Sequence, residues 1–312
     1  MKVGVFLNYI GLGANIMHLS YCHHIAKVYG PITLISLANN LDQALEDDPL
    51  ISEIKILKKN KNIIDIPNIS SNLKHLKLDK IYIFYPSGRI YLAAKLANIK
   101  EVFCYPLFKK KDLHLVEAAK QFTCKHLNLK DCSTETNFKI NEEKINNVEK
   151  YFDKSKCNIV IGAGSSGPDA RWGEDNFSEL INELNKKGEF FFYIQAGPDQ
   201  VNVSQKIISK IKKKNCIDLS TLTVREIIPY LVTCDMYVGN DSFPHHITTQ
   251  SQKPALVLLI NTPKAYTDYS KNYHRVIPPG TNINNLDHTS LHSPNSISVD
   301  IVKDKVLEIK SK

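Results

Sequence analysis

Residues 158–174 read NIVIGAGSSGPDARWGE, and this stretch decides the fold. A short and mostly β-branched run, 158–161, leads into the glycines and serines of 162–167. Glycines allow a tight turn and bring backbone N–H groups close to a ligand, and a helix N-terminus attracts anions. Because a helical pattern follows, we predict a strand, an anion-binding loop and a helix. Arg171 offers a guanidinium for bidentate phosphate binding, whereas we expect Trp172 to pack the loop onto its domain.

The same alternation of short apolar runs and longer amphipathic stretches continues through most of the chain. Such alternation predicts parallel sheets with helices on both faces. The expected strands are 3–8, 32–36, 53–57, 80–85, 101–105, 158–162, 190–195, 216–218, 236–238 and 255–260. The expected helices are 15–28, 89–98, 174–186, 203–213, 224–232, 244–250 and a closing helix within 298–310. The fold class is therefore α/β, with two Rossmann-like, doubly wound parallel sheets.

The polar stretch 131–156 is where we place the domain boundary. We predict a first domain at 1–152 and a second at 153–312, with one strand and one helix inside the polar stretch. Ligands bind at the carboxyl ends of the strands in doubly wound sheets. Two such domains in tandem are expected to face each other across a cleft.

Composition excludes several classes of protein. The chain has 312 residues, of which 43% are hydrophobic, enough for packed cores and too many for wholesale disorder. The longest apolar run, 254–260, is far shorter than the roughly 20 residues of a membrane-spanning helix. No cleavage site follows the apolar N-terminus, and the seven cysteines are scattered without a CxxC pair. These features predict a cytoplasmic protein without a disulfide framework.

The net charge of +8 favours anionic partners. The densest lysine runs are 58–61, 109–111 and 212–214, and solvated loops and helix ends are the alternative explanation for them. No RNA-binding aromatic motif or zinc finger accompanies the charge, so we do not expect nucleic acid as a partner. We place a weak contact with anionic lipids, at the inner membrane face, on Lys109 to Lys111.

The first strand leads into another glycine-containing loop, with Gly11 and Gly13 close to the start of a helix. The dinucleotide-binding pattern is incomplete, because Ile16 takes the place of its third glycine, and no P-loop is present. A plain tight turn and a ligand-binding loop stay equal alternatives at this point.

Polar residues gather again after strand 236–238, where Asp241, Ser242, His245 and His246 open a helix. Asp241 and Ser242 either bind a ligand or only cap the helix. Adjacent helix positions point about 100° apart, so the two histidines are not expected to bind one metal ion, and at most one should face the cleft. The chain has no HExxH, paired DxD or CxxC motif, which favours a metal-independent reaction. It also lacks the Gly-x-Ser-x-Gly elbow of the α/β-hydrolases.

Through these residues the second half resembles the ADP-heptose:lipopolysaccharide heptosyltransferases, glycosyltransferase family nine, whose fold is GT-B. The similarity lies in a hydroxyl-bearing loop followed by a basic residue and Trp, a Gly-Pro turn, a helix start with Leu, and an Asp-Ser block with His before Lys-Pro. The matching residues are 164–166 with 171–172, 196–199, 220–224, 241–246 and 253–254. The resemblance extends over about 158–262, and in the first domain only to the helix entry at Leu12 and Gly13.

The resemblance implies a metal-independent, inverting glycosyltransferase. The enzyme would move a heptose-like sugar from an ADP-linked nucleotide-diphosphate sugar to a lipopolysaccharide-core or other cell-envelope glycan, with no cofactor beyond this substrate. The acceptor would be a glycan or a lipid-linked glycan. The residues implied at the nucleotide sugar are Gly13 in the first loop, Ser165, Ser166, Arg171 and Ser242 at the diphosphate, Leu222 at the adenine, Asp199 or Gln200 at the ribose, and Asp241, Phe243 and His246 near the sugar and phosphate.

Two positions depart from the family's pattern. Ala14 stands where the family has the Asp proposed as its general base, and Phe243 stands where it has a glycine, which would crowd the phosphate. Transfer still needs a group that takes the proton of the acceptor hydroxyl. We predict His18 as this catalytic base, one helical turn beyond Ala14, with a pKa near the ordinary value of about 6.5. His23 and His24 are further candidates, and a buried structural role is the alternative for His18.

Two other functions stay open. A degenerate nucleotide-sugar-binding protein without transfer activity would explain both Ala14 and Phe243. A GT-B sugar-nucleotide epimerase would act on the donor alone, although no carboxylate and histidine set can be assigned to that chemistry.

Overall fold

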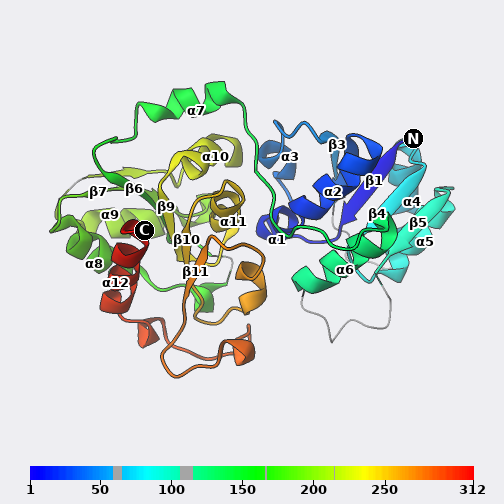
Figure 1. Cartoon of the computed structure of the whole chain (residues 1–312). Helices are drawn as coiled ribbons and strands as arrows, with labels where there is room; N and C mark the ends of the chain where they lie inside the picture. The colour runs from blue at the N-terminus through cyan, green and yellow to red at the C-terminus, as the bar shows by residue number, and fades with distance from the viewer. Residues whose placement is uncertain (59–64, 106–114, 166, 214) are drawn as a thin grey trace. The chain divides into compact units, whose positions relative to one another are not determined.

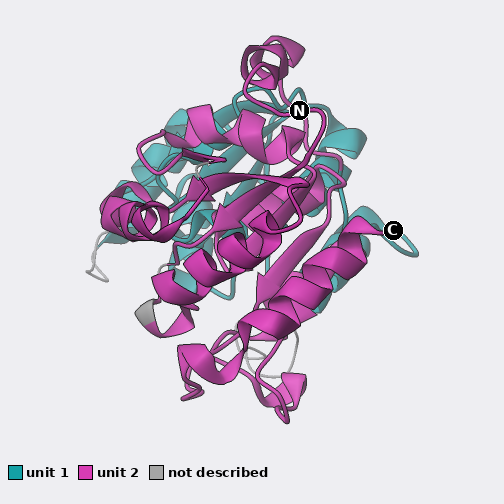
Figure 2. Cartoon of the chain, turned by 90° about the vertical axis from the view of Figure 1, so that its left-hand side faces the viewer, with its two compact units in different colours: residues 1–136 teal, residues 137–312 magenta. Residues whose placement is uncertain are grey.

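The computed structural model describes residues 1–58, 65–105, 115–165, 167–213 and 215–312. The chain divides into two compact units, Met1–Thr136 and Asn137–Lys312 (Figure 2). Each unit holds one parallel sheet of its own. The sequence predicts a boundary between residues 152 and 153, whereas this division precedes α7 (Glu142–Glu149). It does so because α7 packs against α10 (Val224–Thr233) of unit 2.

The sheet of unit 1 has five parallel strands in the order β3-β2-β1-β4-β5 (Figure 1). The strands are β1 (Val3–Leu7), β2 (Ile32–Ser36), β3 (Ile51–Ile56), β4 (Lys80–Ile83) and β5 (Glu101–Cys104). The helices are α1 (Leu12–Met17), α2 (Leu19–Tyr29), α3 (Leu41–Ala44), α4 (Ile66–His75), α5 (Gly88–Leu96) and α6 (Leu115–Leu127). The buried strand β1 lies between β2 and β4, so the loop after β1 leaves the sheet where the strand order reverses. Ligands bind at this point in doubly wound sheets.

Helices cover the sheet of unit 1. α4 packs against α5, and an apolar cluster that includes Phe6, Leu73, Ile83 and Ala93 is buried between these helices and the strands. α2 packs against α6, and the buried Tyr21 hydroxyl of α2 donates to the carbonyl oxygen of Val116 in α6 at 3.0 Å. Apolar strand residues and the apolar sides of these helices therefore form the core of the unit.

The sheet of unit 2 has six parallel strands in the order β11-β10-β9-β6-β7-β8. The strands are β6 (Cys157–Gly162), β7 (Phe190–Gln195), β8 (Cys216–Asp218), β9 (Met236–Asn240), β10 (Ala255–Leu258) and β11 (Tyr273–Val276). The remaining helices are α8 (Glu174–Asn185), α9 (Val201–Lys210), α11 (Phe243–Gln250) and α12 (Val299–Lys310). From β8 to β11, this strand order is that of unit 1 with one strand added at the end. The strand order reverses between β6 and β9.

Helices also cover the sheet of unit 2. α8 packs against α9 and α12, and α10 packs against α7 and α11. The main apolar cluster includes Trp172, Phe177, Phe192 and Val302, all without exposed surface. The closing helix predicted within 298–310 is confirmed as α12, which buries its apolar side on this cluster.

β6 and β9 approach each other closely at their carboxyl ends. Gly162 of β6 lies opposite Gly239 of β9 in the parallel pairing. A Cβ atom on Gly239 would overlap the backbone of Gly162, and a Cβ atom on Gly162 would overlap the Tyr237 ring. Glycine is therefore required at both positions, and the loops after β6 and β9 start from adjacent points.

All ten predicted strands are present, with ends within two residues of the prediction. The prediction missed β11, α3, α4 and α6. The strand predicted within 131–156 is wrong, because these residues form α7 and irregular backbone. The single helix predicted at 15–28 is also wrong: α1 and α2 are separate, since the N–H of His18 bonds the Asn15 carbonyl oxygen three residues back and tightens the last turn of α1.

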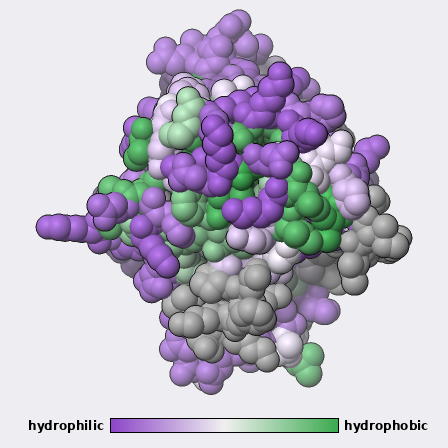
Figure 3. All heavy atoms as spheres, turned by 90° about the vertical axis from the view of Figure 1, so that its right-hand side faces the viewer, coloured by the Kyte–Doolittle hydropathy of each residue, from purple (hydrophilic) through white to green (hydrophobic). Residues whose placement is uncertain are grey.

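Figure 3 shows one face of the molecule, where hydrophilic surface surrounds smaller hydrophobic areas. In unit 1, helix α5 exposes the side chains of Tyr91, Leu92 and Leu96. Lys109 to Lys111, where we predict a lipid contact, lie outside the described residues. Within the described ranges, no helix has the length and apolar character that crossing a membrane requires.

Candidate functional site

The loop that leaves β6 is fixed by hydrogen bonds to two other loops. The N–H of Ser165 donates to Gln200 Oε1 at 3.2 Å, and Gln200 Nε2 donates to the Ser165 carbonyl oxygen at 3.1 Å. Ser165 Oγ donates to the Asp241 carbonyl oxygen, in the loop after β9, at 3.2 Å. A Cβ atom on Gly164 would lie 3.0 Å from Gln200 Oε1, so this position is crowded. The segments that follow β6, β7 and β9 thus meet at one edge of the sheet.

Arg171 lies on this loop and helps to hold it. Its Nε and Nη2 atoms donate to the Ser165 carbonyl oxygen at 3.2 and 2.9 Å. A guanidinium has five N–H donors in a planar fork, so three remain for an anion. Ser166, which the resemblance implies at the diphosphate, lies outside the described residues.

Asn240 connects the end of β9 to the same loop, a role that sequence reasoning missed. Its buried amide donates to the Ala163 carbonyl oxygen at 2.7 Å and accepts from the Trp172 N–H at 3.0 Å. Trp172 is fully buried, donates from Nε1 to the Ile297 carbonyl oxygen at 2.8 Å and packs edge-on against Phe177. The tryptophan therefore packs the loop onto the domain, as predicted. A polar residue at the end of an otherwise apolar strand was the available signal for Asn240.

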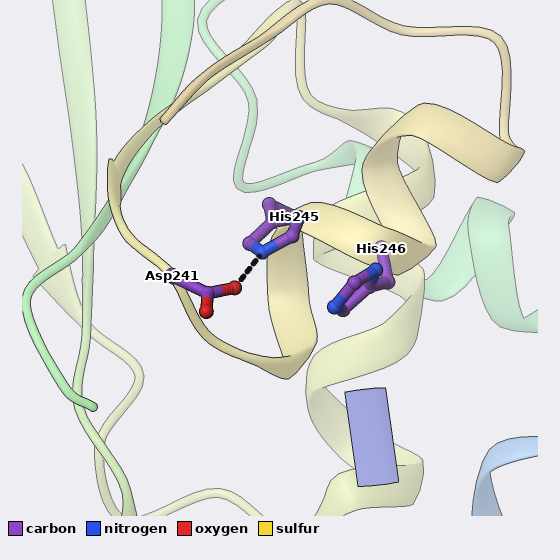
Figure 4. A group of neighbouring side chains, drawn as sticks. All are labelled: Asp241, His245 and His246. Carbon is purple, nitrogen blue, oxygen red and sulfur yellow. Dashed lines mark hydrogen bonds and ion pairs between the residues drawn. The ribbon is translucent and has the colours of Figure 1, made fainter. Parts of the chain in front are cut away.

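Three side chains with possible metal-ligand atoms come together where the chain passes from β9 into α11 (Figure 4). The Asp241 carboxylate accepts a hydrogen bond from His245 Nε2, with 2.7 Å between Oδ1 and Nε2. The imidazole centroids of His245 and His246 lie 3.9 Å apart. One ligand atom from each of the three residues lies within 4.8 Å of the others. Both histidines are buried, and 13% of the Asp241 side chain is exposed.

Two tyrosines hold these imidazoles. His245 Nδ1 lies 3.0 Å from the Tyr273 hydroxyl, and His246 Nδ1 lies 2.7 Å from the Tyr269 hydroxyl. The two hydroxyls lie 2.7 Å from each other. Burial raises the pKa of both hydroxyls well above 10, so they stay neutral.

The prediction that the two histidines would diverge is wrong. Adjacent helix positions point about 100° apart, but the two ring centroids lie 3.9 Å from each other. The hydroxyls of Tyr269 and Tyr273 lie 2.7 Å from each other and bond the two Nδ1 atoms, which holds the rings close together. Tyr273 belongs to β11, the strand that the sequence did not predict.

The start of α11 is not capped by the residues expected to cap it. Ser242 occupies the N-cap position, but its side chain makes no capping hydrogen bond, and its Oγ lies 3.1 Å from the Tyr237 hydroxyl. The Asp241 carboxylate bonds His245 instead. Phe243 is the first helical residue and is half-buried. Pro244 has no N–H, but among the described residues no side chain accepts from the N–H groups of Phe243 and His245, so these two groups offer an anion site.

Two further residues implied by the resemblance lie at the same edge of the sheet. Asp199 is exposed in the turn Pro198–Gln200 after β7. Leu222 is half-buried in the turn between β8 and α10. Among the described residues, neither side chain forms a hydrogen bond with the loop after β6, so for both only the position after a strand agrees with the implied role.

The loop after β1 in unit 1 is also fixed by a buried amide. Asn15 Nδ2 donates to the Tyr9 and Gly11 carbonyl oxygens at 3.1 and 2.8 Å, and Asn15 Oδ1 accepts from Ser36 Oγ at 2.7 Å. Gly13 is the second residue of α1. Sequence reasoning missed Asn15, because an Asn in a helical pattern is not distinctive.

His18 lies between α1 and α2 and is 1% exposed. Its Nδ1 donates to the Ala14 carbonyl oxygen at 2.6 Å, which places the imidazole next to position 14 and leaves the lone pair of the neutral ring on Nε2. Nε2 is buried and has no hydrogen-bond partner among the described residues. The ring stacks on Tyr9 with 4.7 Å between centroids.

Burial lowers the pKa of His18 from 6.5 to about 4, although the hydrogen bond to Ala14 opposes this shift. The prediction of a pKa near 6.5 is therefore wrong, because a charged imidazole has no water around it at this position. His18 is neutral over the range in which most enzymes work.

The two other histidine candidates for the base differ in exposure. His23 is buried, and both of its ring nitrogens are bonded, Nε2 to Asp48 and Nδ1 to Thr136, at 2.6 Å each. His24 is half-buried, and burial followed by the charge of Lys27 lowers its pKa.

A sequence profile of glycosyltransferase family 9 (heptosyltransferase) matches residues 104–293, more than half of the chain. The chain belongs to this family. Among curated proteins, the lipopolysaccharide heptosyltransferase 1 of Campylobacter coli is 24% identical over 139 residues. The match covers 43% of this chain and 41% of the Campylobacter protein, less than half of each.

Solved structures of a family 9 glycosyltransferase and of two heptosyltransferases share the fold along 99% of this chain. A glycosyltransferase from Veillonella parvula has a TM-score of 0.79 at 17% identity, covering 99% of this chain and 96% of its own. The ADP-heptose lipopolysaccharide heptosyltransferase II of E. coli has a TM-score of 0.77 at 16% identity, covering 99% and 98%. An E. coli heptosyltransferase solved with ADP has a TM-score of 0.73 at 12% identity, covering 99% and 100%. The predicted GT-B fold is confirmed.

Proposed function

We propose that this family 9 protein is an inverting glycosyltransferase that moves a heptose-like sugar from an ADP-linked donor to a lipopolysaccharide-core or other cell-envelope glycan. The observation that carries the proposal is the meeting of the β6 loop, the β9 loop and the uncapped start of α11 in unit 2. The names of relatives support the substrate class: the Campylobacter relative is a lipopolysaccharide heptosyltransferase, and an E. coli relative was solved with ADP.

The chemistry of this edge fits a nucleoside diphosphate. Arg171 retains three N–H donors, and the first turn of α11 offers backbone N–H groups. Charge-assisted hydrogen bonds and a helix N-terminus both favour phosphate oxygens. Ser165, Ser242 and Asp241 would line the diphosphate and the sugar, with Leu222 near the base and Asp199 near the ribose.

Inverting transfer requires that the acceptor hydroxyl attack the anomeric carbon while the nucleoside diphosphate leaves and a base takes the hydroxyl proton. We propose His18 Nε2 as this base. The atom carries a lone pair, and the low pKa keeps it unprotonated, but the ring is buried, and the rings of Tyr9, Tyr21 and Phe84 lie against it. A base has to come within hydrogen-bond reach of the hydroxyl, so side chains around His18 must move when the acceptor binds. That the reaction needs no metal ion stays a prediction.

A second function, binding of the nucleotide sugar without transfer, is favoured by one set of observations. Ala14 cannot take a proton, His18 is almost completely buried, and Phe243 stands at the start of the helix that would meet the phosphates. The first two would weaken catalysis and leave donor binding in unit 2 little affected, whereas Phe243 would crowd the phosphates.

Thermal unfolding of the full chain with ADP, UDP, GDP or CMP tests the donor site. A ligand that binds only the folded state stabilises it, by about 2.7 kcal/mol at one hundred times its Kd. We expect the largest shift with ADP, and no shift with any nucleotide would refute the donor site. A transfer assay with an ADP-heptose and core glycan acceptors then separates the two functions, since binding without product would support the second.

A further inference from the structure

The geometry points to a divalent metal-ion site in unit 2, formed by Asp241, His245 and His246. The ion would be a borderline transition metal such as Zn²⁺, for which imidazole and carboxylate groups are common ligands. Three protein ligands leave at least one coordination position for water or an anion.

The three side chains lie close to the arrangement that such an ion needs. Their ligand atoms are within 4.8 Å of one another, and Asp241 Oδ1 and His245 Nε2 are 2.7 Å apart. Ligand atoms around a tetrahedral zinc ion lie about 3.3 Å apart, given metal–ligand distances of roughly 2.0–2.2 Å. Zn²⁺ binding therefore requires Asp241 Oδ1 and His245 Nε2 to move slightly apart. Ligand atoms that lie more than about 3.3 Å from each other must move closer together. Side-chain torsions can supply both movements.

The partners of the two imidazoles suit metal binding. A metal-binding histidine usually donates its other ring N–H to a fixed acceptor. Here the Tyr273 and Tyr269 hydroxyls lie 3.0 and 2.7 Å from the two Nδ1 atoms, so each ring can turn Nε2 to the ion. The Tyr273 hydroxyl also accepts from Thr249 Oγ1 at 2.9 Å, and it can donate its own proton to the Tyr269 hydroxyl, 2.7 Å away, when it accepts one from His245.

A hydrogen-bonded Asp–His pair alone does not account for this arrangement. Such a pair needs Asp241 and His245, but the second imidazole, His246, is also buried and lies 3.9 Å from the first. Sequence reasoning did not expect a joint site, because it considered the directions of adjacent helix positions and not the tyrosine hydroxyls.

The site lies beside the loop of the proposed donor site, because Ser165 Oγ bonds the Asp241 carbonyl oxygen. An ion there would add positive charge where a diphosphate would bind. This role rests on the proposed function, whereas the metal site does not. We assign the ion no step of the transfer reaction.

Titration of chelator-treated, tag-free full chain with Co²⁺ and Zn²⁺, without nucleotide, tests the site. Co²⁺ in a four- or five-coordinate site gives visible absorption bands, and Zn²⁺ affinity is measured by competition with a chromophoric chelator. Asp241→Asn, His245→Gln and His246→Gln remove one ligand each. Tyr269→Phe leaves all three ligands in place and removes one hydroxyl. His292→Gln is the matched control, a histidine of the same unit outside the cluster.

We expect Co²⁺ bands with the parent protein that Zn²⁺ abolishes, and Zn²⁺ affinity at least about tenfold weaker in each ligand variant. Tyr269→Phe should weaken binding by about tenfold, since loss of such a partner typically costs 10- to 100-fold. His292→Gln should bind like the parent. Asp241→Asn keeps the side-chain shape and can still accept from His245, so its unchanged affinity would overturn the proposal even if the histidine variants fail to fold. Absence of Co²⁺ bands with the parent would also overturn it, without bearing on nucleotide binding.

Discussion

Acid should destabilise unit 1 through His18. In the unfolded chain this imidazole has its ordinary pKa of 6.5, whereas burial lowers the folded value to about 4. The unfolded state therefore binds the proton first, and the stability contributed by the neutral ring is present above pH 6.5 and is lost as the pH falls toward 4. The full loss is about 3 kcal/mol, from about 1.4 kcal/mol per pKa unit. Between pH 7.5 and 5 the loss is about 2 kcal/mol.

His18→Asn isolates this effect, because the Asn amide can still donate to the Ala14 carbonyl oxygen but does not titrate. Urea unfolding followed by far-ultraviolet circular dichroism at pH 7.5 and 5 gives the loss of unfolding free energy for each protein. We expect the loss to be about 2 kcal/mol smaller in His18→Asn than in the parent. His75→Asn, at an exposed position of unit 1, should behave like the parent. An equal loss in the parent and in His18→Asn would refute the reasoning.

Three further outcomes are expected. Arg171→Ala should weaken ADP binding by about 1.5–3 kcal/mol, a rise in Kd of about 10- to 150-fold by calorimetry, and an unchanged Kd would remove Arg171 from the donor site. His18→Asn should lower turnover about 10²–10⁴-fold with the ADP Kd unchanged, and adding Ala14→Asp should restore part of the lost turnover. If His18→Asn turns over like the parent, His18 is not the catalytic base. The chain should float with anionic vesicles at low salt and less at high salt, because each Lys or Arg near the surface contributes about 1 kcal/mol within a Debye length of about 8 Å. Equal recovery with neutral vesicles would refute the lipid contact at Lys109 to Lys111.

The central strands were predictable because they are buried on both faces and are therefore continuous apolar runs. β11 was missed because it is an edge strand in which His274 and Arg275 are only half-buried, so its sequence lacks that signal. The break between α1 and α2 depends on a local backbone turn at His18, which no spacing of apolar residues indicates.

The loops of the candidate site were predictable, but the contacts within them were not. Glycine, serine and Arg171 after β6 predict an anion-binding loop by composition alone. Asn240 bonds the distant backbone of Ala163 and Trp172, and Asn15 bonds the distant hydroxyl of Ser36. The close approach of the His245 and His246 rings depends on tyrosines more than twenty residues away. Such partners become visible only when the chain is folded.

Trp172 gives the protein a built-in optical probe. It is the sole tryptophan of the chain and lies in unit 2, where its backbone N–H bonds the amide of Asn240, next to Asp241. Selective excitation of indole therefore reads the surroundings of a single loop, free of signal from the tyrosines of unit 1. A ligand that shifts this loop will change the emission of one fluorophore in a known place, and its binding can be followed in real time without any label.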